Sequence, residues 1–212
     1  ASIMGKKNQV MLLDCESLEF EYYPLDLGDY QILLLNTNVS HTLASSEYNT
    51  RRAECEEGVA VLQQHFPNVK SLRDGTMEML ETVINEMRPV VYRRCRHIIT
   101  ENQRVKDATK ALLNKNFKKL GKLIYESHNS LQYDYEVSCP ELDFLAHFTE
   151  TLPYVLGSRM MGGGFGGCTI NIIKKDKVKT FIDAVSGIYF NRFNTYLTPY
   201  EVAIEDGAKI IK

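Results

Sequence analysis

Residues 160–169 hold the residue types that most clearly point to ligand chemistry. Phe165 is surrounded in this segment by five glycines: Gly162, Gly163, Gly164, Gly166 and Gly167. Glycine is favoured where the backbone needs a positive φ, or where a ligand or another backbone comes very close. Successive exposed N–H groups in such a bend can also bind an anion. A tight turn between two strands would explain the same glycines, so the segment alone leaves both interpretations open.

Two familiar nucleotide-binding motifs nearly fit this segment. The spacing of three of its glycines matches the dinucleotide fingerprint, but that motif opens a helix, whereas residues 168–173 are β-branched and alternate as in a strand. A phosphate-binding loop also nearly fits, but Cys168 stands where that loop has the lysine that reaches the phosphates. The segment is therefore predicted to be a glycine-rich bend between strands, and neither of these two motifs.

Two further stretches could meet a ligand. Residues 36–41 are mostly polar and lead from a predicted strand to a predicted helix, a place where side chains and N–H groups often meet a ligand. Turn and capping chemistry by Asn, Ser and Thr explains them equally simply, and we favour it on the residues alone. Tyr48 lies in the first turn of that helix, where its phenol could face a cleft or the core.

A basic cluster, Arg93, Arg94, Arg96 and His97, could form a phosphate patch. Nearby acids such as Glu101 and Asp107 favour a solvated helix face with salt bridges.

Other titratable residues have simple structural interpretations. His128 is on the apolar side of its predicted helix and is interpreted as a core histidine with a hydrogen-bond partner. Capping and solvation explain the carboxylates Asp134, Glu136, Glu141 and Asp143, and the histidine spacing does not predict a metal site.

The composition is that of an ordinary globular protein. The chain has 212 residues, of which 44% are hydrophobic and 25% charged, and its formal net charge is −2. This charge argues against a general nucleic-acid-binding surface. Five scattered cysteines without a C-x-x-C pair predict reduced thiols in a cytoplasmic protein. The apolar runs are too short to span a membrane, and we expect neither a membrane partner nor a secretory leader.

The hydrophobic pattern predicts an α+β protein. Strands are expected at residues 9–15, 18–25, 31–37, 154–161, 168–173 and 200–204, and helices at residues 46–65, 76–87, 91–112, 117–131, 141–148 and 178–189. Ser138 and Glu141 have the spacing of a capping box for the fifth helix. From residue 31 onward the order is strand, helices, strand, strand, helix, strand. That order predicts a ferredoxin-like split βαβ fold with extra helices in the first crossover.

The predicted domain boundary follows from the same order. Residues 29–212 form the split βαβ domain, and the strand pair in residues 1–28 is interpreted as the trailing part of a preceding domain. Residues 1–5 resemble the last turn of a helix that closes on Gly5. We therefore expect this sequence to be a piece of a longer protein.

Five segments in order along the chain resemble the galactokinases, members of the GHMP (galacto-, homoserine, mevalonate and phosphomevalonate) kinase superfamily. They are residues 36–52, 93–102, 127–131, 134–143 and 157–169. The glycine segment alone resembles the third motif of the wider superfamily. The five segments together resemble galactokinases specifically, and they cover nearly the whole chain.

This resemblance implies an enzyme that uses ATP and Mg²⁺ to phosphorylate galactose at its anomeric hydroxyl. It implies that the phosphate loop, the magnesium-binding acid and the catalytic aspartate precede Ala1. The chain would then be the C-terminal half, with the N-terminal half as its partner, no catalytic residue or metal ligand of its own, and no activity alone. Tyr48 is expected to bind a galactose hydroxyl, and residues 162–167 to form a floor near the sugar and phosphates. A valine at Gly164 is expected to reduce phosphorylation without altering the fold.

Two other functions fit the same residues. A galactose- and ATP-binding regulator on the same fold would bind both ligands without turnover. An isolated ferredoxin-like interaction module would use the glycine segment only as a turn. The residues leave open whether the sugar is galactose or its N-acetylamino relative.

Overall fold

A four-stranded antiparallel sheet forms one side of the molecule. The computed structural model describes residues 2–40 and 44–208. Its main sheet contains β3 (Tyr30–Ser40), β4 (Val155–Met160), β5 (Gly166–Lys174) and β6 (Thr198–Val202), in the spatial order β4-β5-β3-β6. Leu33 and Leu35 of β3 are fully buried, and β3 pairs with both β5 and β6. The predicted central strand is confirmed, because β3 lies between two paired strands.

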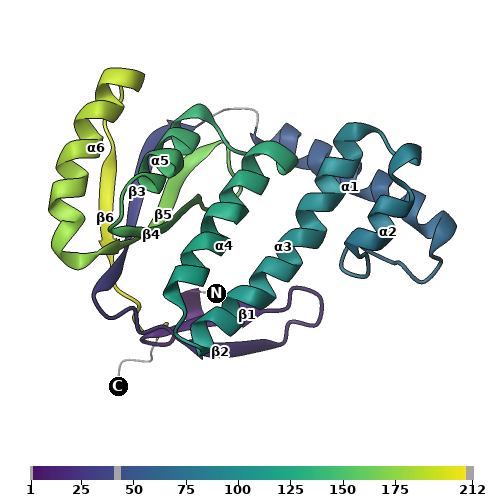
Figure 1. Ribbon diagram of the computed structural model, residues 1–212, viewed down its shortest axis with the longest axis horizontal. Coiled ribbons are helices and arrows are strands. Elements are labelled where there is room, and N and C mark those ends of the chain that lie inside the picture. Colours follow the sequence, from purple (N-terminus) through teal and green to yellow (C-terminus); the bar gives the residue numbers. More distant parts are fainter. Residues whose placement is uncertain (1, 41–43, 209–212) are drawn as a thin grey trace.

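In the part of the chain that the structure describes, six α-helices fill the crossovers of this sheet. They are α1 (Ala44–His65), α2 (Met77–Thr82), α3 (Pro89–Leu113), α4 (Phe117–Ser130), α5 (Pro140–Glu150) and α6 (Val178–Phe193). The first five separate β3 from β4, and α6 separates β5 from β6. Figure 1 shows the sheet beside α5 and α6, with α1 and α2 at the far end of the molecule. The split βαβ fold with extra helices is confirmed.

Four buried apolar clusters are present among the described residues, and the two with the most buried residues are the main cores. One lies between the sheet and α5 and α6, and includes Leu35, Leu145, Phe181 and Tyr189. The other lies among α1, α2 and α3, with Leu62, Leu80, Val83, Val91 and Cys95. Each large apolar side chain buried in this way contributes roughly 1.5–3 kcal/mol. The inserted helices therefore have a core of their own and do not depend on the sheet alone.

Two local predictions are wrong in detail. The helix expected at residues 76–87 ends at Thr82, because Val83 leaves helical geometry (φ −108°, ψ 13°). The Val83 side chain is buried in the core among α1, α2 and α3, and the short 3₁₀ turn η2 (Ile84–Glu86) follows. The capping box is also absent. Cys139 caps α5 without a side-chain hydrogen bond, and Pro140 takes the first helical position, where a missing N–H has no effect.

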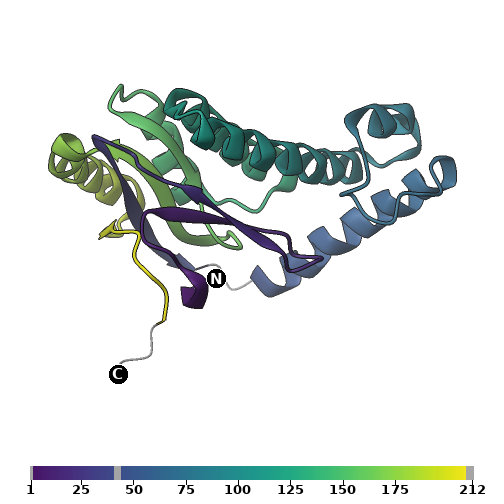
Figure 2. The same ribbon diagram turned by 90° about the horizontal axis from the view of Figure 1, so that it is seen from below.

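The N-terminal strands form a small sheet of their own. β1 (Gln9–Leu13) and β2 (Phe20–Pro24) pair only with each other among the described residues. Figure 2 shows this hairpin running beneath the main sheet and the helices. The Asn8 N–H donates to the Ile204 carbonyl, and Arg73 donates twice to Asp14, at 2.6 and 3.0 Å. The boundary placed between residues 28 and 29 stays a prediction.

The described helices carry no segment long and apolar enough to cross a membrane.

Candidate functional site

The glycine segment connects the two neighbouring strands β4 and β5. Gly166 and Gly167 already belong to β5, so the connecting loop is shorter than the predicted bend and covers residues 161–165. The Met161 N–H donates to the Cys168 carbonyl at 3.0 Å, which closes the loop. Four of its glycines have φ values that other residues rarely adopt: Gly162 (+78°), Gly164 (+86°), Gly166 (+126°) and Gly167 (+86°). The expected glycine-rich bend between strands is thus present, and its backbone requires glycine at most positions.

Gly164 is glycine because another backbone lies against it. A Cβ atom built on Gly164 would lie 2.0 Å from the Val137 carbonyl oxygen. The next residue, Phe165, donates its N–H to the same oxygen at 2.8 Å and itself has φ +58°. The expectation that a valine here would leave the fold unaltered is therefore wrong, since the side chain would push the bend away from Val137.

The other side of the bend is open. A Cβ built on Gly162, Gly163 or Gly167 would meet no atom within 4 Å. Gly163 also has no positive φ, so nothing in the chain itself requires a glycine there. This open strip of backbone is a surface that a small ligand could approach closely.

Tyr48 projects from the first turns of α1. Its side chain is 63% exposed, and it lies at the edge of a hollow of ≈ 370 Å³. Tyr135, Cys55, Leu72 and Ile98 line the same hollow, whereas the bend residues do not. Tyr48 is thus accessible to a ligand. The predicted contact between its hydroxyl and a sugar remains a prediction.

The polar stretch after the central strand belongs to β3 itself. β3 continues to Ser40, with a bulge between Asn36 and Ser40 where its pairing with β5 shifts. Thr37 is buried, and its hydroxyl donates to the Gly167 carbonyl at 2.8 Å. Asn38 (φ +55°) donates to the Tyr196 carbonyl at 2.8 Å. The bulge therefore supports the start of β5 and the bend, while His41 lies outside the described residues.

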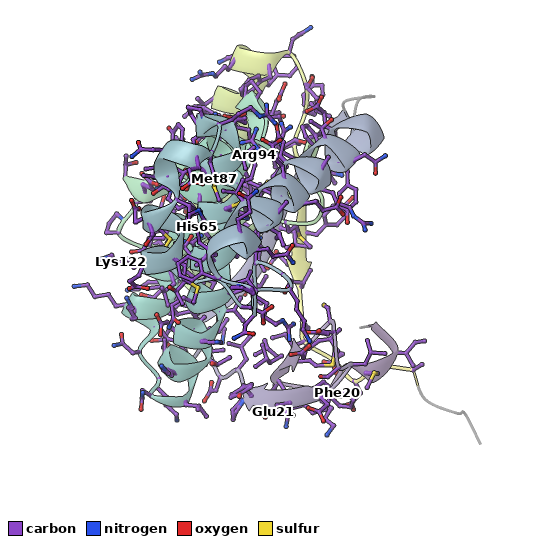
Figure 3. All side chains as sticks on the ribbon, turned by 90° about the vertical axis from the view of Figure 1, so that its right-hand side faces the viewer. Phe20, Glu21, His65, Met87, Arg94 and Lys122 are labelled. Carbon is purple, nitrogen blue, oxygen red and sulfur yellow. The ribbon has the colours of Figure 1, made fainter. Side chains whose placement is uncertain are left out.

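The basic cluster on α3 is paired, and only part of it is solvated: the side chains of Arg93 and Arg96 are 36% and 40% exposed. Arg94 is only 1% exposed and donates to Glu54 of α1 at 2.7 Å and to Glu136 at 2.8 Å. Figure 3 shows Arg94 amid the packed helices, far from Phe20 and Glu21 on the N-terminal hairpin. Hydrogen bonds from Arg94 lower the pKa of Glu136. The predicted solvation is therefore wrong for Arg94, because Glu54 of α1 and the segment after α4 cover it here.

The remaining members of the cluster are also tied to that segment. Arg93 donates to Glu136 at 2.7 Å, and Arg96 pairs with Asp134. His97 is buried, lies 2.9 Å from the Ser130 hydroxyl and stacks on Tyr135 with ring centroids 4.6 Å apart. Burial lowers the pKa of His97 to about 4. Each of these groups thus has at least one partner within the protein.

His128 is a core histidine, as predicted. It is fully buried, and its Nδ1 accepts the Met160 N–H at 3.2 Å, while Nε2 lies 3.4 Å from an Asp143 oxygen. Glu141 and Asp143 lie in the first turn of α5. Asp134 and Glu136 bind arginines, so they are ion-pair partners of the α3 cluster, and Asp134 is buried.

Sequence reasoning missed one residue beside the site. On α1, Arg51 forms an i, i+4 ion pair with Glu47 at 3.0 Å, as the spacing of these two residues favours. Arg51 is also 8% exposed and donates to the carbonyls of Tyr135 at 2.7 Å and Glu136 at 2.9 Å. These backbone acceptors are more than 80 residues away along the chain, so no local pattern could have revealed them.

The described residues contain no group of three His, Cys, Asp or Glu side chains that could hold a metal ion. The open glycine strip, in contrast, fits the close approach of a bound sugar or phosphate.

Comparison with known families gives this geometry a context. A family model described as "GHMP kinases C terminal" matches residues 108–191, which run from α3 through the glycine bend to α6. The chain contains a GHMP kinase C-terminal domain. Its mixed helix and sheet architecture is the GHMP kinase C-terminal fold.

Several curated relatives of this GHMP kinase domain are galactokinases. The chain is 45% identical to galactokinase from Lactobacillus helveticus over all of its length, which is 54% of that protein. It is 44% identical to galactokinase from Staphylococcus carnosus, over 99% of the chain and 54% of that protein. The chain therefore spans about half the length of the curated relatives it matches.

Solved structures agree with this placement. The crystal structure of Lactococcus lactis galactokinase complexed with galactose matches 96% of the chain and 53% of its own chain, with a TM-score of 0.90 and 36% identity. The L. major mevalonate kinase complexed with R-mevalonate matches 94% of the chain and 50% of its own, with a TM-score of 0.55 and 15% identity. The second match concerns the GHMP fold only.

Proposed function

We propose that this chain is the C-terminal half of a galactokinase, which transfers the γ-phosphoryl group of ATP to the anomeric hydroxyl of galactose with Mg²⁺. The observation that carries the proposal is similarity along the whole chain to galactokinases, one of which was solved with galactose bound. The five segments that resemble galactokinases include Tyr48, Arg51 and the glycine bend.

Two features of the structure support roles in sugar binding. Tyr48 has an exposed side chain, and we propose that its hydroxyl binds a hydroxyl of galactose. Gly162, Gly163 and Gly167 have open space above their backbones, and we propose that this strip forms the floor beside the sugar and the phosphates. Val137 holds the bend in place from the protein side through the Phe165 N–H.

The other half of the protein is proposed to supply the chemistry. Phosphoryl transfer depends mostly on positioning and on stabilisation of charge. The family resemblance assigns the phosphate loop, the magnesium-binding acid and the catalytic aspartate to the preceding half. We therefore propose that the chain is inactive alone and works with that half, in the cytoplasm, without a nucleic-acid or membrane partner.

The direct test is an assay of the whole protein with MgATP. We expect galactose 1-phosphate from the whole protein and no sugar phosphate from this chain alone. Binding of galactose and ATP without turnover would indicate a regulator instead. A parallel assay with N-acetylgalactosamine decides which sugar the enzyme prefers.

A matched pair of glycine variants tests the proposed floor. Gly163→Val in the whole protein adds a side chain over open space, so the fold should be retained while bound sugar or phosphate is obstructed. We expect kcat/KM for galactose to fall by about tenfold or more, because small displacements of reacting groups have large effects. Gly187→Val on α6, where a Cβ also meets no atom within 4 Å, is the control and should keep full activity. Full activity of Gly163→Val would contradict the floor assignment.

A further inference from the structure

Arg51 connects the helix that carries Tyr48 to the segment that supports the glycine bend. It lies three residues after Tyr48 on α1, and its guanidinium makes contacts in two directions. Nη1 lies 3.0 Å from Glu47, the residue before Tyr48. Nε and Nη2 donate to the carbonyls of Tyr135 and Glu136. One buried side chain thus fixes the Tyr48 turn to the backbone at residues 135–136.

That backbone leads directly to the bend. Glu136 has a left-handed conformation (φ +55°), and the next residue, Val137, accepts the Phe165 N–H at 2.8 Å. Phe165 is left-handed as well, with φ +58°. Non-glycine residues in this conformation cost about 1–3 kcal/mol and persist only where the surroundings hold them. Phe165 is the donor of this backbone hydrogen bond, and Glu136 directly precedes its acceptor, Val137. Arg51 therefore binds the backbone right beside two left-handed residues.

We propose that Arg51 is a positioning residue for sugar binding, because it fixes Tyr48 relative to the glycine bend through residues 135–137. This inference rests on the proposed function, which takes Tyr48 and the bend as the two sugar-facing groups. Arginine suits this role because its planar guanidinium donates several hydrogen bonds in fixed directions. A lysine keeps the charge but cannot hold two carbonyls and a carboxylate in one geometry.

The test uses the Arg51→Lys variant of the whole protein in two backgrounds. Alone, it should raise KM for galactose about tenfold and change KM for ATP less than about twofold, because the defect concerns the position of a sugar contact. In a Tyr48→Phe background, the same change should raise KM for galactose less than about twofold, because its effect acts through the Tyr48 hydroxyl. Equal factors in both backgrounds, or an unchanged KM, would overturn the proposal.

A second measurement does not require turnover. Amide hydrogen exchange of peptides that cover residues 161–167 should be about tenfold faster in Arg51→Lys, because the support of Val137 is weakened. Arg88→Lys is the matched control. Arg88, just before α3, also forms a bidentate ion pair, with Glu57 of α1, and both side chains are exposed. Its replacement should alter neither hydrogen exchange at the bend nor KM for galactose.

Exchange also separates this inference from the proposed function. If the whole protein does not phosphorylate galactose, the proposed function fails. If hydrogen exchange at residues 161–167 is unchanged in Arg51→Lys, the Arg51 inference fails as well. If Arg51→Lys does not fold, Glu47→Gln weakens the same link from the α1 side and should raise KM for galactose in the same direction. An unchanged KM in Glu47→Gln would then count against Arg51.

Discussion

The neighbouring atoms determine which glycines of the bend the fold requires and which face open space. Gly164 lies against the Val137 carbonyl, whereas Gly163 meets no neighbour. The two glycines are neighbours in the chain, but substitution of Gly164 should destabilise the fold and substitution of Gly163 should not. The same contrast separates Arg51 from Arg52, because Arg51 is buried against backbone carbonyls and Arg52 forms an exposed pair with Glu56.

Gly164→Ala should destabilise the fold. Its Cβ would lie 2.0 Å from the Val137 oxygen, and alanine would have to adopt φ +86°. We expect the free energy of unfolding to fall by about 2 kcal/mol or more, from strain and the lost Phe165 hydrogen bond. Urea unfolding followed by circular dichroism measures this. Gly163→Ala is the control, and equal stability of the two variants would contradict the packing argument.

His97 should make stability depend on pH. Burial lowers its pKa from the usual 6.5 to about 4. The unfolded chain therefore binds this proton more tightly than the folded protein does. The resulting stabilisation is complete above pH 6.5 and is lost as the pH falls toward 4. Its size is about 3 kcal/mol at most.

The measurement is the free energy of unfolding between pH 7 and 4, for the parent protein and for His97→Gln. Acidic residues titrate near the lower end of this range in both proteins, so the difference between the two curves isolates the histidine. We expect a shallower decline in the variant. Parallel curves would show that His97 does not carry this pH dependence.

At the scale of elements, α1, α3 and the segment after α4 are joined by ion pairs around the buried Arg94. Arg94 of α3 binds Glu54 of α1 and Glu136 of the segment, and it also donates to the Asp134 carbonyl. Such a cluster fixes how three elements meet, because each charge needs its partner at one place. The bend and Tyr48 are attached to two of these elements.

Arg94→Met should destabilise the protein by about 3–5 kcal/mol, because Glu54 and Glu136 would lose their shared cation in a largely buried place. Arg88→Met removes the exposed pair with Glu57 and should cost about 1 kcal/mol or less. Thermal unfolding of both variants makes the comparison. Similar losses would mean that burial does not set the strength of the Arg94 cluster.

At the scale of the whole molecule, the N-terminal hairpin stands apart from the main sheet. Leu13 and Phe20 are 39% and 41% exposed, and a two-stranded sheet alone is marginally stable in water. We expect the amides of β1 and β2 to exchange much faster than those of β3 and β5 in this chain by itself. In the whole protein, their protection should rise if the hairpin completes a neighbouring domain, as hydrogen exchange can determine. Equal protection in both samples would argue against the boundary near residue 28.

Much of the fold followed from local pattern. Apolar runs and alternation predicted the central strand β3, the hairpin, and the long helices α1, α3 and α4. An element buries one face only when its apolar residues recur with the period of a helix or a strand. The order of these elements predicted the split βαβ sheet. The α2 boundary and the start of α5 were wrong, because the burial of Val83 and a proline at the first helical position decided them.

The sequence by itself determined the glycine bend, the core role of His128 and the resemblance to galactokinases, since these depend on residue types at short spacing. Only the tertiary structure decided that Gly164 packs on Val137, that Arg94 of α3 is buried and that Arg51 binds the carbonyls of Tyr135 and Glu136. The physical reason is that these contacts join residues distant along the chain, and a hydrogen bond across such a separation leaves no trace in the local pattern of either partner.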